Sequence, residues 1–285
     1  MTRIPWATKA WNLWEGCTKH SAECANCYAT RECNRLAGNP NPKVSGPCAG
    51  VVTDAETWTG RVNFVQERLD QPRQWHREER IFVGSRTDIF HESIKLDHQL
   101  ACFQRIFEHR QHRYLLLTKR VDRAVDVLRA IFRHFKLAAL PPHVWLGCTA
   151  GTQKNLDERA ELLTTAFPTS NLFLSAEPLL EPIDVSRWLW RDPCLRTGRV
   201  TGGFRWVIAG AESGYKRRYV GLRAFEMLRD QCTANIPRIP YFLKQVHAGF
   251  DMDARPELVK EPTLGGVRWE QFPDEMMLER EMSLG

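Results

Sequence analysis

The chain has 285 residues, which is enough for one large α/β domain or for two domains of ordinary size. Its content of 43% hydrophobic and 26% charged residues is typical of globular proteins and excludes a disordered or collagen-like chain. The net charge is +6, and residues 101–137 carry a local excess of Lys and Arg. Such an excess is typical either of a helix face that binds polyanions or of a solvated helix surface.

No apolar run in the sequence approaches the roughly 20 residues that a membrane-spanning helix needs. The N-terminus is rich in Trp but has no apolar run followed by a cleavage site of small residues. We therefore expect a cytoplasmic protein that does not contact a membrane.

The N-terminal part of the chain is predicted to begin with a strand at residues 11–14, followed by a cysteine-rich loop at residues 17–27. Residues 38–60 are rich in Gly and Pro, which interrupt regular secondary structure. We expect this segment to be a loop insertion over one end of the domain.

Six short apolar runs follow, at intervals of about 30 residues, which leave room for a helix and two loops. They lie at residues 81–84, 114–118, 144–147, 171–175, 206–210 and 241–244. Apolar runs without alternation predict parallel strands buried on both faces, and helices are expected at residues 98–109, 120–135 and 155–166. The sequence thus predicts an α/β fold, a partial (β/α) barrel of about six parallel strands over residues 1–250, with residues 251–285 as a tail packed on it.

Polar residues follow each predicted strand at the point where it ends. Loops at the carboxyl ends of parallel strands converge on the ligand site of such folds. A single polar residue there can equally begin a helix, but six consecutive strands with such ends predict a binding site. The residues concerned are Asp88, Lys119, Thr149, Glu177, Glu212 and Lys244.

Three of the nine cysteines are clustered with the spacing C-x6-C-x2-C, at Cys17, Cys24 and Cys27. Thiolates suit either a zinc ion or an iron–sulfur cluster. Zinc requires a fourth ligand, for which His20 or Cys33 is available, whereas a [4Fe–4S] cluster held by three cysteines keeps one iron open. The spacing alone does not choose between these sites. The other cysteines are scattered and are interpreted as small buried hydrophobic residues: Cys33, Cys48, Cys102, Cys148, Cys194 and Cys232.

The position of the motif favours the cluster over zinc or unligated thiols. The motif follows the first predicted strand directly and precedes the strand–helix units. It is therefore expected on the first loop at the carboxyl end of the barrel, above the site predicted from the other strand ends.

The sequence resembles the phage-associated three-Cys-motif family of uncharacterised radical-SAM-like proteins, which are found beside "three-Cys-motif partner" proteins. The resemblance extends over nearly the whole chain. It comprises WNLWEGC at residues 11–17, CANCYA at 24–29, TDIFH at 87–91, LTKR at 117–120, VWLG at 144–147, SAEPLLEPID at 175–184, GAESG at 210–214 and FLKQ at 242–245. Most radical SAM enzymes have a C-x3-C-x-aromatic-C motif, whereas Asn26 precedes Cys27 here, and Tyr28 is expected to take part of the aromatic role.

The resemblance implies a [4Fe–4S] cluster whose open iron binds S-adenosylmethionine, and a radical reaction that abstracts a substrate hydrogen. It further implies that Asp88, Thr149, Glu177 and Glu212 contact the amino group and ribose of S-adenosylmethionine. An anion, either the methionine carboxylate or a substrate phosphate, is expected to meet Lys119, Arg120 and Lys244.

The implied partners are an external electron donor such as flavodoxin or ferredoxin, a three-Cys-motif partner protein, and a nucleic-acid substrate in DNA modification or repair. The alternative from another class is a non-enzymatic nucleic-acid-binding protein with a structural zinc site. Iron and sulfide in the purified protein distinguish the enzyme from this alternative.

Overall fold

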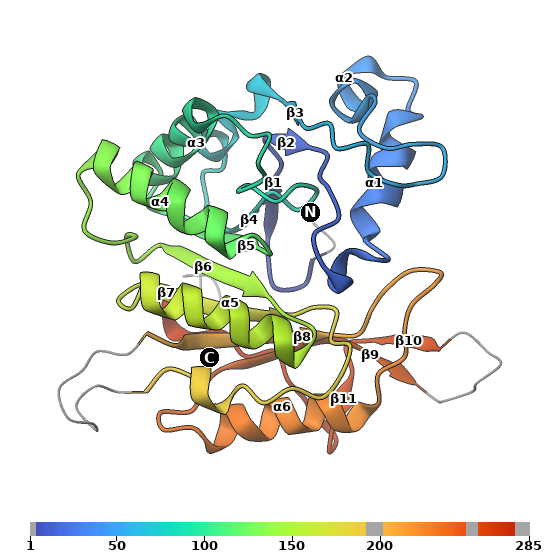
Figure 1. Ribbon diagram of the computed structural model, residues 1–285, viewed down its shortest axis with the longest axis vertical. Coiled ribbons are helices and arrows are strands. Elements are labelled where there is room, and N and C mark those ends of the chain that lie inside the picture. The colour runs from blue at the N-terminus through green and yellow to red at the C-terminus, as the bar shows by residue number, and fades with distance from the viewer. Residues whose placement is uncertain (1–3, 192–201, 249–255, 277–285) are drawn as a thin grey trace. The chain divides into compact units, whose positions relative to one another are not determined.

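The computed structural model describes residues 4–191, 202–248 and 256–276 (Figure 1). Contacts within the chain divide it into two compact units, residues 1–144 and 145–285. Cys194 lies outside the described residues. No helix in the described part of the chain is long and apolar enough to cross a membrane.

The first unit contains three parallel strands in the order β1, β4 and β5. Their bounds are Lys9–Trp11, Arg80–Val83 and Arg113–Thr118. Two helices, α3 (Leu96–Glu108) and α4 (Val121–Phe135), follow β4 and β5 and lie side by side (Figure 1). Their apolar faces supply Phe103, Ile106 and Leu128 to the core of this unit, where all three are almost fully buried.

The strand expected at residues 11–14 is wrong in its bounds. β1 ends at Trp11, and Trp14–Glu15 forms a separate strand, β2, which pairs antiparallel with β3 (Asn63–Phe64). The chain leaves the parallel sheet at Asn12, whose side-chain oxygen accepts a hydrogen bond from the Ser85 hydroxyl at 3.0 Å. Local apolar pattern could not distinguish one strand from two, because Trp11 and Trp14 are both buried.

The Gly/Pro-rich segment at residues 38–60 packs against α1 (Tyr28–Ala37) within the first unit. It contains the short helix α2 (Pro42–Ser45), the 3-10 helix η2 (Gly46–Cys48) and an isolated bridge between Val52 and Trp58. The other 3-10 helices of this unit are η1 (Ala22–Cys24), η3 (Gln66–Arg68) and η4 (Gln71–Gln74).

The second unit contains four parallel strands in chain order, with a fifth strand, β10, antiparallel to β9. Helix α5 (Gln153–Ala166) follows β6, and α6 (Leu222–Ala234) precedes β9. The strands are β6 (Val144–Thr149), β7 (Asn171–Ala176), β8 (Phe204–Gly210), β9 (Tyr241–Ala248) and β10 (Glu257–Lys260). The hairpin β11 (Thr263–Leu264) and β12 (Val267–Arg268) and the 3-10 helices η5 (Ser186–Trp188) and η7 (Asp274–Met276) complete it.

All six apolar runs predicted as strands are strands, namely β4 to β9. Their side chains are nearly all buried, as expected for parallel strands covered on both faces. In the second unit, Trp206 of β8 lies at the centre of an aromatic cluster with Trp145 and Phe173. The predicted α/β fold of parallel strands is confirmed, and the strand order of the described residues stays open in each unit.

Residues 256–276 pack on the strands of the second unit. The backbone amide of Leu243 in β9 donates to the Trp269 carbonyl at 2.7 Å, and the Trp206 indole donates to the Gln271 carbonyl at 3.0 Å. The boundary expected near residue 250 stays a prediction.

Candidate functional site

The three motif cysteines lie on one loop of the first unit. Cys17 follows β2 after a single residue, Cys24 ends η1, and Cys27 is the residue directly before α1. Cys24 is buried, whereas Cys17 and Cys27 are partly exposed. The three thiols are thus presented from a strand end, a 3-10 turn and a helix start.

The start of this loop is fixed by Glu15, which is fully buried at the end of β2. Its carboxylate accepts hydrogen bonds from Arg68 at 2.5 Å and from Arg86 at 2.5 and 2.7 Å. The paired guanidinium groups are the counter-charges that a buried carboxylate requires. Glu15 therefore ties the cysteine loop to η3 and to the loop after β4.

The ends of β4 and β5 meet the loop through Asp88. Its carboxylate accepts from the Thr118 hydroxyl at 2.8 Å and from the Lys119 amide at 3.0 Å. Arg120, only 2% exposed, lies 3.4 Å from the same carboxylate and 3.8 Å from the Cys17 sulfur. Asp88, Arg120 and Cys17 therefore form one connected network, as the sequence-based placement of these residues at strand ends implies.

Arg120 makes contacts that the sequence did not indicate. Its Nε donates to Glu92 at 3.0 Å, and its Nη2 donates to Thr18 at 2.6 Å (hydroxyl) and 3.2 Å (carbonyl). With the contacts to Cys17 and Asp88, each of the five guanidinium N–H groups has an acceptor in this network. Thr18 directly follows the first motif cysteine and Glu92 directly follows TDIFH, which is the only sequence signal for either residue.

The electrostatics of the loop oppose free thiolates. Burial, followed by the charge of Asp88, raises the pKa of Cys17, and Arg120 lowers it in part. Burial likewise raises the pKa of Cys27, and the largest opposing effect comes from the charge of Lys119. The two adjacent cations of the β5–α4 turn thus act on two different motif cysteines. A bound metal would supply the further positive charge that three thiolates need.

Tyr28 is at the first position of α1 and is 38% exposed. Its hydroxyl donates to the Ser85 carbonyl at 2.6 Å, so the ring spans from α1 to the loop after β4.

In the second unit, the predicted site residues are paired with oppositely charged or backbone groups. Lys244 of β9 lies 2.9 Å from the Glu177 carboxylate, which directly follows β7. Gly210, at the end of β8, leaves the room for this pair, because a Cβ there would lie 3.1 Å from Glu177 Oε1. One ion pair therefore joins the carboxyl end of β7 to the middle of β9, across the end of β8.

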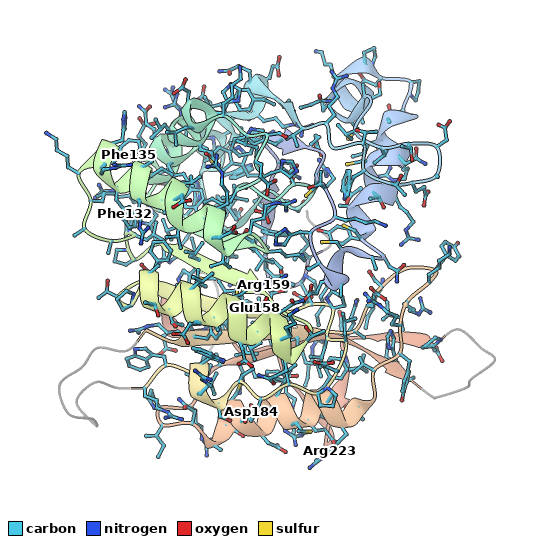
Figure 2. The ribbon with its side chains drawn as sticks, in the orientation of Figure 1. Phe132, Phe135, Glu158, Arg159, Asp184 and Arg223 are labelled. Carbon is cyan, nitrogen blue, oxygen red and sulfur yellow. The ribbon has the colours of Figure 1, made fainter. Side chains whose placement is uncertain are left out.

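Glu212 and Thr149 are held from neighbouring segments of the same unit. Arg218 binds the Glu212 carboxylate at 2.5 Å, and His247 Nε2 lies 3.0 Å from the Glu212 carbonyl. The Thr149 carbonyl accepts from Arg159 of α5, labelled in Figure 2. Arg218 is a partner of a predicted site residue that the sequence reasoning missed.

A second group of thiols lies apart from the motif. Within the described residues, the single set of three potential ligand atoms lying within 4.8 Å of one another belongs to Glu15, Cys33 and Cys48. The Cys33 thiol donates to Glu15 at 3.8 Å, so Cys33 is directed toward the Glu15 carboxylate. Because Arg68 and Arg86 already occupy the Glu15 carboxylate, the set is better suited to structural packing than to metal binding.

The basic segment at residues 101–137 is in part neutralised by carboxylates. Arg105 lies 2.6 Å from Asp70 and 3.1 Å from Glu108, and Arg113 lies 2.7 Å from Glu78. These contacts favour the solvated, ion-paired surface over a phosphate-binding face at Arg105 and Arg113.

Comparison with solved structures finds two mutants of spore photoproduct lyase, one with cysteine replaced by serine and one with tyrosine replaced by phenylalanine. They are 12% and 11% identical to the chain, each with a TM-score of 0.39, and each match covers 88% of this chain and 68% of the other. No curated protein matches the sequence. The model of one family, described as protein of unknown function (DUF5131), matches residues 1–273, and the chain belongs to this family.

Proposed function

We propose that the chain is a radical S-adenosylmethionine enzyme in which Cys17, Cys24 and Cys27 hold a [4Fe–4S] cluster. The observation that carries the proposal is the position of the three thiols on one loop, with Arg120 3.8 Å from Cys17 and the loop anchored to the end of β5. Three soft ligands beside a fixed cation suit a negatively charged iron–sulfur group.

The spacing of the motif cysteines supports a cluster over a single zinc ion. Thiolates that share one zinc ion lie about 3.8 Å apart, since each Zn–S bond is about 2.3 Å long. In the described part of the chain, the sulfur atoms of the three motif cysteines do not all lie within 4.8 Å of one another. A cluster tolerates wider spacing, because each cysteine binds a different iron.

When bound, a cluster with one open iron supplies the electron that cleaves S-adenosylmethionine. The chain's part is to hold the cluster and to orient the cofactor. Asp88 already accepts three hydrogen bonds from the β5–α4 turn, so its main role in the proposal is to fix that turn. Glu177, Glu212, Thr149 and Lys244 remain the proposed contacts to the cofactor or to an anion, and Tyr28 a proposed contact to the adenosyl group.

The proposal extends to membership in the phage-associated three-Cys-motif family, and hence to a partner protein of that system. It also includes a nucleic-acid substrate and reduction by flavodoxin or ferredoxin. Lys119 is the proposed cation for a substrate phosphate, because its charge acts on the motif residue Cys27.

The function is tested by reconstituting the protein with iron and sulfide without oxygen, reducing it, and adding S-adenosylmethionine. We expect slow release of 5′-deoxyadenosine from the wild type and from Cys102→Ala, whose buried thiol lies in α3. Cys27→Ala should release none. A reduced, cluster-containing wild type that forms no 5′-deoxyadenosine, with or without DNA or RNA, contradicts the proposal.

A further inference from the structure

The turn between β5 and α4 places a buried cation against the cysteine loop. Arg120 is the residue directly before α4 and is 2% exposed, so water does not screen its charge effectively. Its guanidinium lies 3.8 Å from Cys17 Sγ, within the range of a hydrogen bond to sulfur. The charge of Arg120 therefore acts directly on one of the three proposed cluster ligands.

The guanidinium cannot leave this position without losing several hydrogen bonds. Glu92 holds Nε, Asp88 lies beside Nη1, and the Thr18 hydroxyl and carbonyl hold Nη2. Four of the five N–H groups thus orient the fifth toward the sulfur. Because these contacts use all five donors, we infer for Arg120 a role other than the anion binding that the resemblance implied.

Hydrogen bonds to cluster sulfurs and nearby charges are among the factors that set the reduction potential of an iron–sulfur cluster. The reduced cluster carries one more negative charge than the oxidised cluster, and a fixed cation in a poorly solvated site stabilises that charge. We propose that Arg120 is a positioning residue that orients the Cys17 loop and raises the reduction potential of the cluster held there. This inference rests on the proposed function.

The chain offers matched variants for a test. Arg120→Gln keeps a hydrogen-bond donor but removes the charge, and Arg120→Lys keeps the charge but removes the planar fork. Arg129→Gln removes the same charge from an exposed position of α4, about 13 Å further along the helix. Each variant is reconstituted without oxygen, its iron is counted, and its potential is measured by redox titration followed by electron paramagnetic resonance.

We expect Arg120→Gln to bind iron as the wild type does, with a more negative potential. The potential of Arg120→Lys should lie between those of the wild type and Arg120→Gln, and the potential of Arg129→Gln should equal that of the wild type. The inference is also supported if Arg120→Gln loses the cluster while Arg120→Lys keeps it with a lowered potential.

The inference is overturned if Arg120→Gln has a full iron content and an unchanged potential. Loss of the cluster from both Arg120 variants overturns it too, because Arg120 would then be needed to build the site. A reconstituted wild-type protein that contains no iron would contradict the proposed function and not this inference alone.

Discussion

Gly16 determines how the chain enters the cysteine loop. It has a φ of 104°, a conformation that side chains other than glycine rarely adopt. A Cβ at this position would overlap the Arg61 carbonyl oxygen, which belongs to the backbone and cannot move aside easily. Glycine is therefore the residue that fits between the buried Glu15 and Cys17.

We expect Gly16→Ala to lower the free energy of unfolding by at least about 1 kcal/mol and to reduce iron incorporation, because the strained backbone displaces Cys17. Urea unfolding and iron analysis measure the two effects. Gly46→Ala is the matched control, since Gly46 has no positive φ and no atom within 4 Å of an added Cβ. Equal free energies of unfolding and equal iron contents of the two variants would show that the cysteine loop does not require glycine at position 16.

The spacing of Cys17, Cys24 and Cys27 identified them as candidate ligands, and Asp88 and Arg120 could be predicted from their places after strands. The residues that bind to these side chains could not be predicted. Glu15 is bound by Arg68 and Arg86, which are 53 and 71 residues away, and Thr18 meets Arg120 at a separation of 102 residues. Such contacts depend on the tertiary fold, so no local pattern indicates them.

At the scale of secondary-structure elements, the Glu177–Lys244 pair connects the end of β7 to β9. Both side chains are mostly buried, with 12% and 23% exposed. Lys244→Met would leave the Glu177 carboxylate without its lysine and should destabilise the protein by about 1–3 kcal/mol. Adding Glu177→Gln should recover part of this loss.

A double-mutant cycle by urea unfolding measures the coupling between Glu177 and Lys244. The control cycle uses Lys154 and Glu158, an exposed pair on α5 at 4.0 Å, for which we expect a coupling of at most about 0.5 kcal/mol. Additive effects of the Glu177 and Lys244 substitutions would show that the pair does not hold the two strands together.

The strands and helices were predictable because continuous apolar runs and helical periodicity are local properties. β4 to β8 follow their predicted runs within two residues at each end, and α4 begins one residue after its expected start at residue 120. β9 extends four residues beyond the run predicted at residues 241–244, so Lys244 lies inside this strand and not at its end. The division of the N-terminal strand into β1 and β2 was not predictable, since it depends on pairing with β3 about 50 residues later.

For the whole molecule, buried histidines predict how stability depends on pH. Burial lowers the pKa of His112 and His143, although each also bonds a backbone carbonyl at 3.0 Å. Below about pH 6.5 the unfolded chain therefore binds more protons than the folded chain. The free energy of unfolding should fall as the pH decreases below this value, by at most about 1.4 kcal/mol per pH unit for each histidine.

Urea unfolding at several pH values measures this dependence. His112→Gln and His143→Gln should each make it shallower, whereas His134→Gln, at an exposed position of α4, should leave it unchanged. A slope that neither buried substitution alters would show that these histidines do not control the acid sensitivity.

The central claim is that the motif cysteines hold a [4Fe–4S] cluster. Metal and sulfide analysis of protein purified and reconstituted without oxygen tests it most directly, with a visible spectrum of each sample. We expect a brown protein with about four irons and four sulfides per chain. Alanine at Cys17, Cys24 or Cys27 should remove them, whereas alanine at the buried Cys102 or Cys232 should not. A colourless protein with one zinc ion, or iron that survives all three motif substitutions, would contradict the claim.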